Sequence, residues 1–407
     1  NSVSGGYEVS NSLRFNDNDS ASLSFTPSGN PTDADKFTIS CWIKLGNIGV
    51  NNAKIYDTGG SDNNNRFAFQ FQGTNSTLMT SNNAGISIIT SSVLRDPSAW
   101  YHVVAAIDSQ NSTTNNKHII YINGVQADLG TNNLGSQSQV GAMTNGVAQY
   151  IGRNGGADNS HFDGYMTEVC WIDGSQLDQT SFGEFDSDSP TIWKPIDVSG
   201  LTFGTNGFYL DFENASSLGA DVSGNSNNFT VNNLTSVDQS TDTCTNNAIT
   251  FNPLDVTSDD EPTLSEGNLK AVADGAFHQQ RSTFYLTSGK WYWEFKPTTV
   301  GNAMQGGVVG SNYAGGSGLR RNYSYNGQKY TDGSASSYGA TYTANDIIGV
   351  ALDLDNGTLI FYKNGASQGT AYTDMLSAIG QDGWTPDVII YNSTVEMNFG
   401  SPPYSIS

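Results

Sequence analysis

The sequence contains few charged residues and few cysteines. Charged residues are 14% of the 407-residue chain, against about 25% in an average domain. The three cysteines, Cys41, Cys170 and Cys244, lack the CxxC or Cys/His spacing of a zinc site. Cys41 and Cys170 lie in strand-like apolar runs and could be neighbours in a sheet. Because thiols pack as small hydrophobic groups, we expect them to be buried and free.

Basic residues are also scarce. The chain has 17 basic and 39 acidic residues, and its formal net charge is −22. A field of that sign repels phosphate backbones and anionic lipids, so we expect no nucleic-acid partner and no anionic membrane surface. No apolar run approaches the roughly 18 residues of a membrane span, so we expect no membrane insertion. The sequence begins at Asn1 rather than Met, and we expect an upstream segment such as a signal peptide or anchoring region.

Asn, Ser, Thr and Gly occupy the positions that charged residues usually fill, and they favour turns over helix interiors. Between them, apolar residues alternate with polar ones in runs such as 37–44, 66–71 and 164–172. In the last run, Tyr165, Val169 and Trp171 are expected to share one face. Such alternation predicts antiparallel sheets with one apolar and one solvated face, and hence an all-β sandwich fold.

Two Asn-Gly pairs lie between strand-like runs, at Asn123-Gly124 and Asn364-Gly365. Asn and Gly tolerate positive φ angles, which makes the pair a strong signal for a β-hairpin. The two hairpins are more than 200 residues apart. We therefore expect two sandwiches in series: residues 1–190 and residues 263–407. The turn-rich segment 191–262 is expected to be a connector whose strands complete the second sandwich.

The motifs of the first region resemble those of a laminin G-like domain of the concanavalin A jelly-roll class. They are the strand at 37–44, the WYHV strand at 100–107, the INGV hairpin and the closing FDGYMTEVCWIDG segment at 162–174. This resemblance implies a candidate Ca²⁺ site at a sheet rim, because Ca²⁺ prefers oxygen ligands. The candidates are Asp17 with Asp19, and Asp158 with Asp163. The alternative is that these acids form ordinary Asx turns.

The motifs of the last region resemble those of a SPRY domain. They are GKWYWE at 289–294, DIIGVALDLD at 346–355, FYKNG at 361–365 and GTAY at 369–372. The family implies a bent β-sandwich that binds partners through loops at one end of its sheets. The tandem is similar to tail-fibre and other virion surface proteins of marine bacteriophages. That resemblance implies an extracellular location on a virion surface.

The segment 318–327 is the main candidate for ligand contact. It concentrates Arg320 and Arg321 beside Tyr323 and Tyr325, residue types that are common in recognition loops. The alternative is that both tyrosines are strand residues of the core. On the first interpretation, replacing both arginines with alanine weakens attachment and leaves the melting temperature unchanged. Two further rim-loop candidates are Arg66, after 62–65, and Arg153.

No motif points to catalysis. A concanavalin-type hydrolase needs paired carboxylates, spaced E-x-D-x-x-E on one strand. The nearest match, Glu184, Asp186 and Asp188, places its last acid one position early and lies in a loop-like segment. The four histidines form no HExxH or triad-like pattern, and His102 and His118 are expected to face solvent. We expect no catalytic residues and no enzyme activity.

These observations favour a non-catalytic adhesion protein that binds host-cell glycan. We expect a homo-oligomer. Two alternatives remain: a purely structural virion component, whose loops pack against sister subunits, and a glycan hydrolase. An exposed aromatic cluster would favour adhesion, burial of the same loops between subunits would favour the structural role, and a facing carboxylate pair in a cleft would favour hydrolysis.

Overall fold

The computed structural model describes residues 6–49, 51–59, 66–74, 76–82, 85–134, 141–255, 261–310, 319–378 and 383–405. It confirms the all-β fold class, because the helices of this part are four single turns of 3₁₀ helix. They are η1 (Asp17–Asp19), η2 (Thr114–Asn116), η3 (Gln179–Ser181) and η4 (Ser236–Asp238). None of the helices in these ranges has the length and apolar character needed to cross a bilayer. The chain divides into two compact units, Asn1–Asn247 and Ala248–Ser407.

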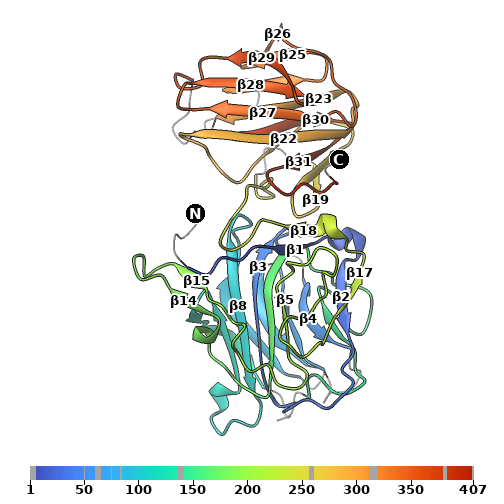
Figure 1. The fold of residues 1–407 in the computed structure, drawn as a ribbon, viewed down its shortest axis with the longest axis vertical. Helices are drawn as coiled ribbons and strands as arrows, with labels where there is room; N and C mark the ends of the chain where they lie inside the picture. Colours follow the sequence, from blue (N-terminus) through green and yellow to red (C-terminus); the bar gives the residue numbers. More distant parts are fainter. Residues whose placement is uncertain are drawn as a thin grey trace. The chain divides into compact units, whose positions relative to one another are not determined.

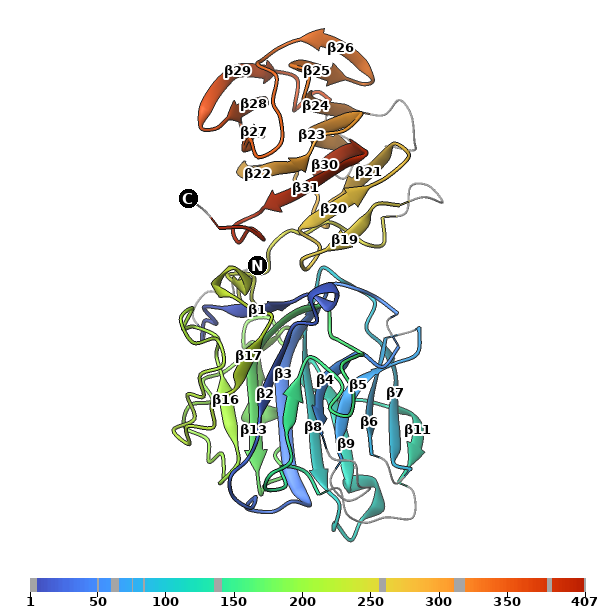
Figure 2. The ribbon, with the colours of Figure 1, turned by 90° about the vertical axis from the view of Figure 1, so that its right-hand side faces the viewer.

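The first unit is a sandwich of two eight-stranded antiparallel sheets with a small added hairpin (Figure 1, Figure 2). The first sheet has the order β10 (Val125–Gln126), β9 (His118–Ile122), β8 (Trp100–Asp108), β3 (Lys36–Leu45), β13 (Gly164–Asp173), β1 (Ser12–Phe15) and β18 (Gln239–Ser240), with β16 (Phe208–Leu210) also beside β13. The second has the order β11 (Leu129–Asn133), β7 (Ser87–Val93), β6 (Thr77–Ser81), β5 (Ala68–Gln72), β4 (Lys54–Thr58), β12 (Gln149–Ile151), β2 (Ser22–Phe25) and β17 (Thr230–Asn232). The hairpin joins β14 (Gly183–Phe185) to β15 (Trp193–Pro195).

The predicted apolar faces of β3 and β5 form the main core of this sandwich. Phe37 of β3 and Phe69 of β5 are fully buried in one cluster of side chains from both sheets. The ring of Phe37 stacks on Trp171 of β13 at 4.5 Å between centroids. Burying side chains of this size stabilises the fold by about 1.5–3 kcal/mol each, so the alternation in the sequence accounts for how the two sheets pack.

Strand β13 contains a β-bulge that the alternation does not reveal. Its pairing with β3 shifts between Thr167 and Cys170, and Glu168 there has a φ of 52°. The extra residue reverses the side-chain direction, so Val169 and Trp171 face the main core while Tyr165 faces the opposite side. The prediction that Tyr165 shares their face is therefore wrong.

The outer face of β3 and β13 is covered rather than solvated. Trp42, Trp100, Tyr165 and Trp193 form a separate buried cluster there, and Cys170 belongs to another. The covering residues come from the hairpin β14–β15 and from the segment that follows it. The expectation of a solvated second face fails because a third layer of chain packs on this sheet.

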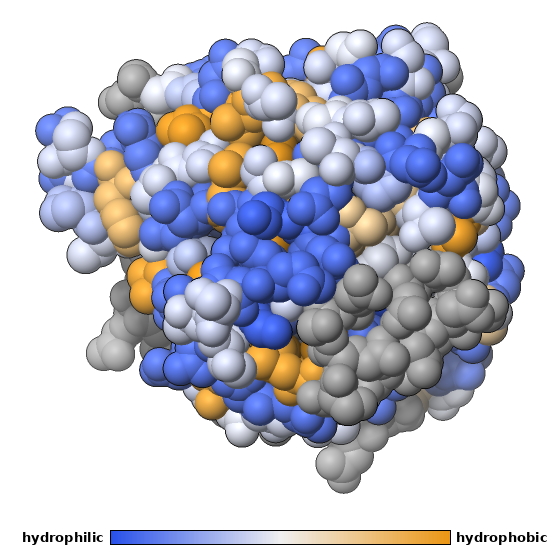
Figure 3. All heavy atoms as spheres, turned by 90° about the horizontal axis from the view of Figure 1, so that it is seen from below, coloured by the Kyte–Doolittle hydropathy of each residue, from blue (hydrophilic) through white to orange (hydrophobic). Residues whose placement is uncertain are grey.

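The surface of the first unit in Figure 3 is largely hydrophilic. Hydrophobic residues appear on it in groups that are separated by hydrophilic residues. Scattered hydrophobic residues are normal on protein surfaces and do not by themselves indicate a binding site.

The connector completes the first sandwich and not the second, which corrects the expectation for 191–262. Strand β16 pairs with β13, β17 with β2, and β18 with β1. Phe208 and Phe229 of this segment are buried in the main core of the first unit, with ring centroids 4.7 Å apart. These aromatic residues require an apolar partner surface, and the first sandwich supplies it. The part from Ala248 onward belongs to the second unit.

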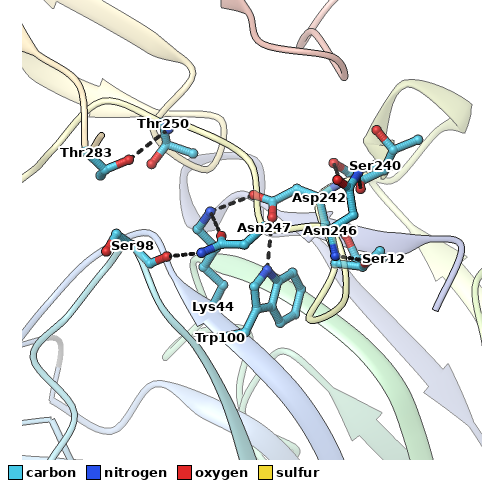
Figure 4. A network of polar contacts seen from close by, with 12 residues as sticks. Ser12, Lys44, Ser98, Trp100, Ser240, Asp242, Asn246, Asn247, Thr250 and Thr283 are labelled. Carbon is cyan, nitrogen blue, oxygen red and sulfur yellow. Dashed lines mark hydrogen bonds and ion pairs between the residues drawn. The ribbon is translucent and has the colours of Figure 1, made fainter. Parts of the chain in front are cut away.

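A buried polar network fastens the end of the connector to the first unit (Figure 4). The carboxylate of Asp242 accepts hydrogen bonds from Lys44 Nζ at 2.8 Å and from Trp100 Nε1 at 2.9 Å. Lys44 Nζ also donates to Asn247 Oδ1 at 2.9 Å. Because Lys44 and Asp242 are both almost fully buried, separating them would leave a charge in an apolar environment.

The second unit is a sandwich of a seven-stranded and a six-stranded antiparallel sheet. The seven-stranded sheet has the order β19 (Thr263–Ser265), β20 (Lys270–Ala273), β31 (Ser393–Asn398), β22 (Lys290–Thr299), β27 (Ile348–Asp353), β28 (Thr358–Lys363) and β29 (Ala366–Tyr372). The six-stranded sheet has the order β21 (His278–Arg281), β30 (Trp384–Tyr391), β23 (Ala303–Gly310), β24 (Arg320–Ser324), β25 (Gln328–Thr331) and β26 (Ser334–Ser337). Trp293, Phe295, Tyr323 and Trp384 are among the side chains that fill the space between the sheets.

Candidate ligand-binding face

The predicted recognition loop is a strand. Arg320, Arg321 and Tyr323 lie in β24, in the middle of the six-stranded sheet. Tyr323 is fully buried, and its hydroxyl donates to the carbonyl of Ala340. Tyr325, just after the strand, packs half-buried against the same core. The alternative interpretation, a strand and core residue, is correct for Tyr323, whereas Tyr325 flanks the strand and packs against the core. Gly318 lies outside the described residues.

Arg321 is buried and ion-paired. Its guanidinium contacts the carboxylates of Asp332 and Asp374, each at 2.7 Å. Arg320 lies 4.0 Å from the buried carboxylate of Asp387. Removing both arginines would break these pairs, so the expectation of an unchanged melting temperature is corrected: we expect it to fall. Neither guanidinium is placed to contact a large ligand without losing a protein partner.

The two rim-loop arginines of the first unit are also ion-paired. Arg66 contacts Asp57 at 2.9 Å, and residues 62–65 lie outside the described residues. Arg153 contacts Asp158 at 2.9 Å and lies over the ring of Tyr150, 4.6 Å from its centroid. Both side chains therefore stabilise the local fold.

The four predicted Ca²⁺ ligands are divided between two places. Asp17 and Asp19 lie in η1, where Asp19 accepts a hydrogen bond from Asn16 Nδ2 at 2.8 Å. Asp158 is exposed and ion-paired, whereas Asp163 is buried beside a small internal cavity of about 10 Å³. Within the described ranges, no three His, Cys, Asp or Glu side chains are placed to share a metal ion. A calcium site therefore stays a prediction without a complete ligand set.

His102 and His118 are buried, contrary to the expectation that they face solvent. Ser40 Oγ lies 2.8 Å from His102 Nε2, a contact that resembles a nucleophile–base pair. However, Trp193 Nε1 can only donate, and it donates to His102 Nδ1 at 2.9 Å. The neutral ring therefore carries its proton on Nε2 and donates to Ser40, so it cannot accept the serine proton. Burial also lowers the pKa of His102 to about 3.

The acids nearest to the hydrolase motif are engaged in a surface hairpin. Glu184 of β14 and Asp186 lie 3.2 and 3.4 Å from Lys194 of β15. Backbone N–H groups of Ser189 and Asp188, followed by Lys194, hold the pKa of Asp186 below its usual range. Asp188 follows the hairpin strand in the loop to β15. A general acid needs a raised pKa, whereas the pKa of Asp186 is lowered. This arrangement therefore stabilises a turn and does not supply a proton.

A large aromatic side chain is exposed on the outward face of the seven-stranded sheet. Tyr292 of β22 is 58% exposed. Alternation along β22 directs Trp293 and Phe295 into the core and Tyr292 and Glu294 outward. The neighbouring strands β27 and β28 add Gly349, Ala351, Ile360 and Tyr362 to the same face. We call these six residues, Tyr292, Glu294, Gly349, Ala351, Ile360 and Tyr362, the aromatic face.

The strand register places these residues in two rows. Tyr292 lies opposite Ala351, which lies opposite Ile360; Glu294 lies opposite Gly349, which lies opposite Tyr362. The rings of Tyr292 and Tyr362 meet edge to face, with centroids 6.4 Å apart and planes at 75°. The small residues on β27 leave room for the Tyr292 ring to lie over Gly349 and against Tyr362.

Hydrogen bonds fix the polar side of the aromatic face. Tyr292 donates its hydroxyl to Glu294 Oε1 at 2.9 Å, and Asn398 Nδ2 of β31 donates to Glu294 Oε2 at 2.9 Å. Partial burial, followed by the hydrogen bond and charge of Glu294, raises the pKa of Tyr292 to about 12. The tyrosine therefore remains protonated and the carboxylate remains oriented at neutral pH.

Comparison with known families divides the chain as the fold does. Residues 16–178 match the model of the concanavalin A-like lectin/glucanases superfamily, and residues 290–402 match the model of the SPRY domain. The chain carries a concanavalin A-like domain and a SPRY domain in tandem. The aromatic face lies within the SPRY domain, and two of its residues, Tyr292 and Glu294, belong to the GKWYWE motif.

The curated relatives share only part of their length with this chain. An E3 ubiquitin-protein ligase RKP from Arabidopsis thaliana is 27% identical over 135 residues, which are 31% of this chain and 10% of the relative. Ran-binding protein 10 from Danio rerio is 33% identical over 93 residues, which are 21% and 14% of the two chains. Ran-binding protein 9 from Danio rerio is 28% identical over 150 residues, or 34% and 24%. The chain thus spans between a tenth and a quarter of these relatives.

Solved structures also resemble part of the chain. The SPRY domain of human HERC1 has 20% sequence identity and a TM-score of 0.29, covering 32% of this chain and 89% of that one. Stonustoxin has 22% identity and a TM-score of 0.28, covering 37% of this chain and 27% of that one.

Charges are balanced on the outward face of the SPRY sheet. Lys270, Glu396 and Lys296 lie opposite one another on β20, β31 and β22, and Lys296 Nζ is 3.7 Å from Glu396. Lys290 lies opposite Asp353, and the two are 3.3 Å apart. With Glu294, these strands present three lysines and three acids. In a chain of net charge −22, this face is locally neutral.

The sequence contains a signal for the aromatic face in addition to the arginine-rich segment. The motif places Trp291, Tyr292 and Trp293 in succession on one strand. Because successive strand residues point to opposite faces, at least one of three consecutive aromatic residues must point away from the core. Tyr362, in the FYKNG motif, is the second outward ring.

Proposed function

We propose that this chain is a non-catalytic binding protein that acts outside the cell, on a virion surface or tail fibre, and attaches to host-cell glycan. The aromatic face is the observation that carries the proposal. Sugar rings present C–H surfaces that stack on aromatic rings and hydroxyls that bond to carboxylate and amide groups. Exposed Tyr292 and half-buried Tyr362, beside an oriented carboxylate, offer both kinds of contact.

The domain families support a binding role in general. SPRY and laminin G-like domains are modules for interaction, and two of the relatives above are named for binding another protein, Ran. The geometry adds that the Ser40–His102 pair has the wrong tautomer for a base and that Glu184 and Asp186 are tied to Lys194. These observations favour a role without catalysis.

A structural role in a virion is the second candidate, because the aromatic face also contains the apolar side chains Ile360 and Ala351. Such a face could be covered by a sister subunit in a homo-oligomer. Size-exclusion chromatography with light scattering distinguishes the two candidates. A monomer, or an oligomer whose tyrosines remain accessible to a surface-labelling reagent, supports attachment. An oligomer in which Tyr292 is protected supports the structural role.

Attachment is tested by applying the full chain to an array of cell-surface glycans, with and without Ca²⁺. We expect binding to a subset of glycans at micromolar protein, since shallow glycan sites commonly depend on few contacts. A heat-denatured sample of the same chain is the control for nonspecific adsorption. Failure to bind any surface glycan under these conditions contradicts the proposal.

A further inference from the structure

We propose that the aromatic face is itself the glycan site and that it takes neutral pyranose sugars rather than anionic ones. Tyr292 and Tyr362 supply the stacking surfaces, and Glu294 accepts hydrogen bonds from sugar hydroxyls. The inference rests on the proposed function and adds to it the residues that contact the sugar and the class of sugar. None of its residues was among the candidates from the sequence.

The arrangement of the two tyrosines makes a corner. Their rings are close to perpendicular and their centroids are 6.4 Å apart, so the edge of one meets the face of the other. Tyr292 remains 58% exposed. A sugar ring in this corner can stack on one tyrosine while its rim touches the other, which orients the sugar more strictly than a single ring would.

Glycine at position 349 makes this corner possible. A Cβ atom at Gly349 would lie 2.5 Å from the hydroxyl oxygen of Tyr292, which is much closer than van der Waals contact. Gly349 is opposite both Glu294 and Tyr362 in the register. An alanine here would force the Tyr292 ring away from Glu294, with no change to any side chain of the core.

Glu294 is an oriented hydrogen-bond acceptor that can accept further hydrogen bonds. Each of its carboxylate oxygens accepts one hydrogen bond within the protein, from Tyr292 or from Asn398. An ionised carboxylate can accept about four. Sugar hydroxyls are donors that fit the remaining positions, whereas a ligand carboxylate or sulfate would face Glu294 with the same charge.

The charge balance of the face selects against anionic sugars. Lys296 and Lys290 lie 3.7 and 3.3 Å from acids on the neighbouring strands, and the whole chain carries a net charge of −22. An anionic ligand would have to compete with those acids for the lysines and would be repelled at long range. A neutral sugar meets neither obstacle.

The decisive test measures binding of the full chain by isothermal titration calorimetry to a neutral hexose polysaccharide, mannan or dextran, and to an acidic one, alginate. We expect binding to a neutral polymer and none to alginate. Tyr292→Ala and Tyr362→Ala are each expected to weaken that binding by about tenfold. Gly349→Ala is expected to weaken it similarly by displacing the Tyr292 ring.

Phe277→Ala is the matched control. Phe277 is another aromatic side chain of the second unit, 65% exposed, and its ring contacts Tyr391 and not the aromatic face. Unchanged binding in this variant, together with loss in the tyrosine variants, supports the site. Thermal unfolding of every variant verifies that the fold is retained, which is expected for Tyr292→Ala because its side chain is largely exposed.

Other results overturn separate parts of the inference. If the parent chain binds neutral glycan and both tyrosine variants bind equally well, the site is elsewhere and the proposed function stands. If the parent chain binds only alginate, the class of sugar is wrong. If it binds none of these polymers and none on the array, the proposed function fails together with this inference.

Discussion

At the scale of single residues, Glu168 combines several unfavourable features in one place. It is a buried acid with a φ of 52°, in the bulge of a central strand. The hydroxyls of Tyr209 and Tyr7 donate to its Oε2 at 2.7 and 3.3 Å. Burial, with a smaller contribution from the acids Asp211 and Glu213, raises the pKa of Glu168 to about 7, even though those hydrogen bonds act in the opposite direction.

This pKa makes the stability of the first unit depend on pH. Below pH 4.5, which is the pKa of Glu168 in the unfolded chain, the side chain is protonated in both states. It therefore does not lower the free energy of unfolding there. As the pH rises to 7 and beyond, the Glu168 carboxyl ionises more easily in the unfolded chain than in the folded one. The free energy of unfolding therefore falls by on the order of 3 kcal/mol. We predict that Glu168→Gln raises the melting temperature markedly at pH 8 and little at pH 4.

Differential scanning calorimetry of the parent and variant chains across this range measures the effect. Other acids titrate in both proteins, so their contributions cancel in the difference. An identical stabilisation at pH 4 and pH 8 would show that Glu168 does not titrate near neutrality in the folded protein.

At the scale of elements, the two Asn-Gly hairpins have the same backbone and different surroundings. Their φ angles are 48° and 79° for Asn123-Gly124, and 48° and 78° for Asn364-Gly365. A Cβ at Gly365 would meet nothing within 4 Å, whereas one at Gly124 would overlap the indole ring of Trp193. The first hairpin therefore serves as a packing surface as well as a turn.

This contrast predicts that the same substitution lowers the free energy of unfolding by different amounts at the two glycines. Gly365→Ala is expected to cost about 1 kcal/mol, because L-residues are disfavoured at positive φ. Gly124→Ala is expected to cost about 2 kcal/mol more, because Trp193 must move and release its hydrogen bond to His102. Chemical denaturation of the two variants measures both costs, and equal values would mean that Trp193 adapts without loss.

Much of the element structure follows from the sequence. Alternation places Phe37 and Phe69 in the core because a strand directs successive side chains to opposite faces. The bulge at Glu168 was not predictable, because glutamate has no special preference for positive φ. The SPRY strand β24 was misread as a loop because its polar residues, Arg320 and Arg321, satisfy their charges with distant acids such as Asp374 and Asp387.

At the scale of the whole molecule, the connector shows why domain limits could not be taken from motifs alone. The laminin G-like motifs end near residue 174, yet Phe208 and Phe229 still belong to the first core. Their pairing partners, β13 and β2, are distant in sequence, and short turn-rich strands carry too little pattern to name a partner. The candidate site was missed for a related reason, since its residues come from three strands that only the register brings together.

The buried network around Asp242 predicts which part of the chain becomes less stable when the network is broken. We predict that Asp242→Ala lowers the melting temperature of the first unit, because Lys44 would be left as a buried charge without this carboxylate. The cost of such a change is about 3–5 kcal/mol. Calorimetry and limited proteolysis of the connector measure it, and Asp355→Ala, at an exposed turn of the second unit, is the control.

A shared melting temperature for Asp242→Ala and the parent chain would contradict this role of the network. So would increased proteolysis confined to the second unit. Loss of protection between residues 208 and 247 is the expected pattern, because β16, β17 and β18 are attached to the first sandwich.

The boundary between Asn247 and Ala248 also bears on how such a chain can be inherited. A recombination event at this peptide bond keeps every strand with the sheet to which it is hydrogen-bonded, so either module can be exchanged for a variant without refolding the other. An exchange at residue 190 would instead separate four strands, β15, β16, β17 and β18, from their partners in the first unit, together with the aromatic residues of that segment. Viable chimaeras should therefore cluster at the later junction, where the second module can change while the first is transmitted intact.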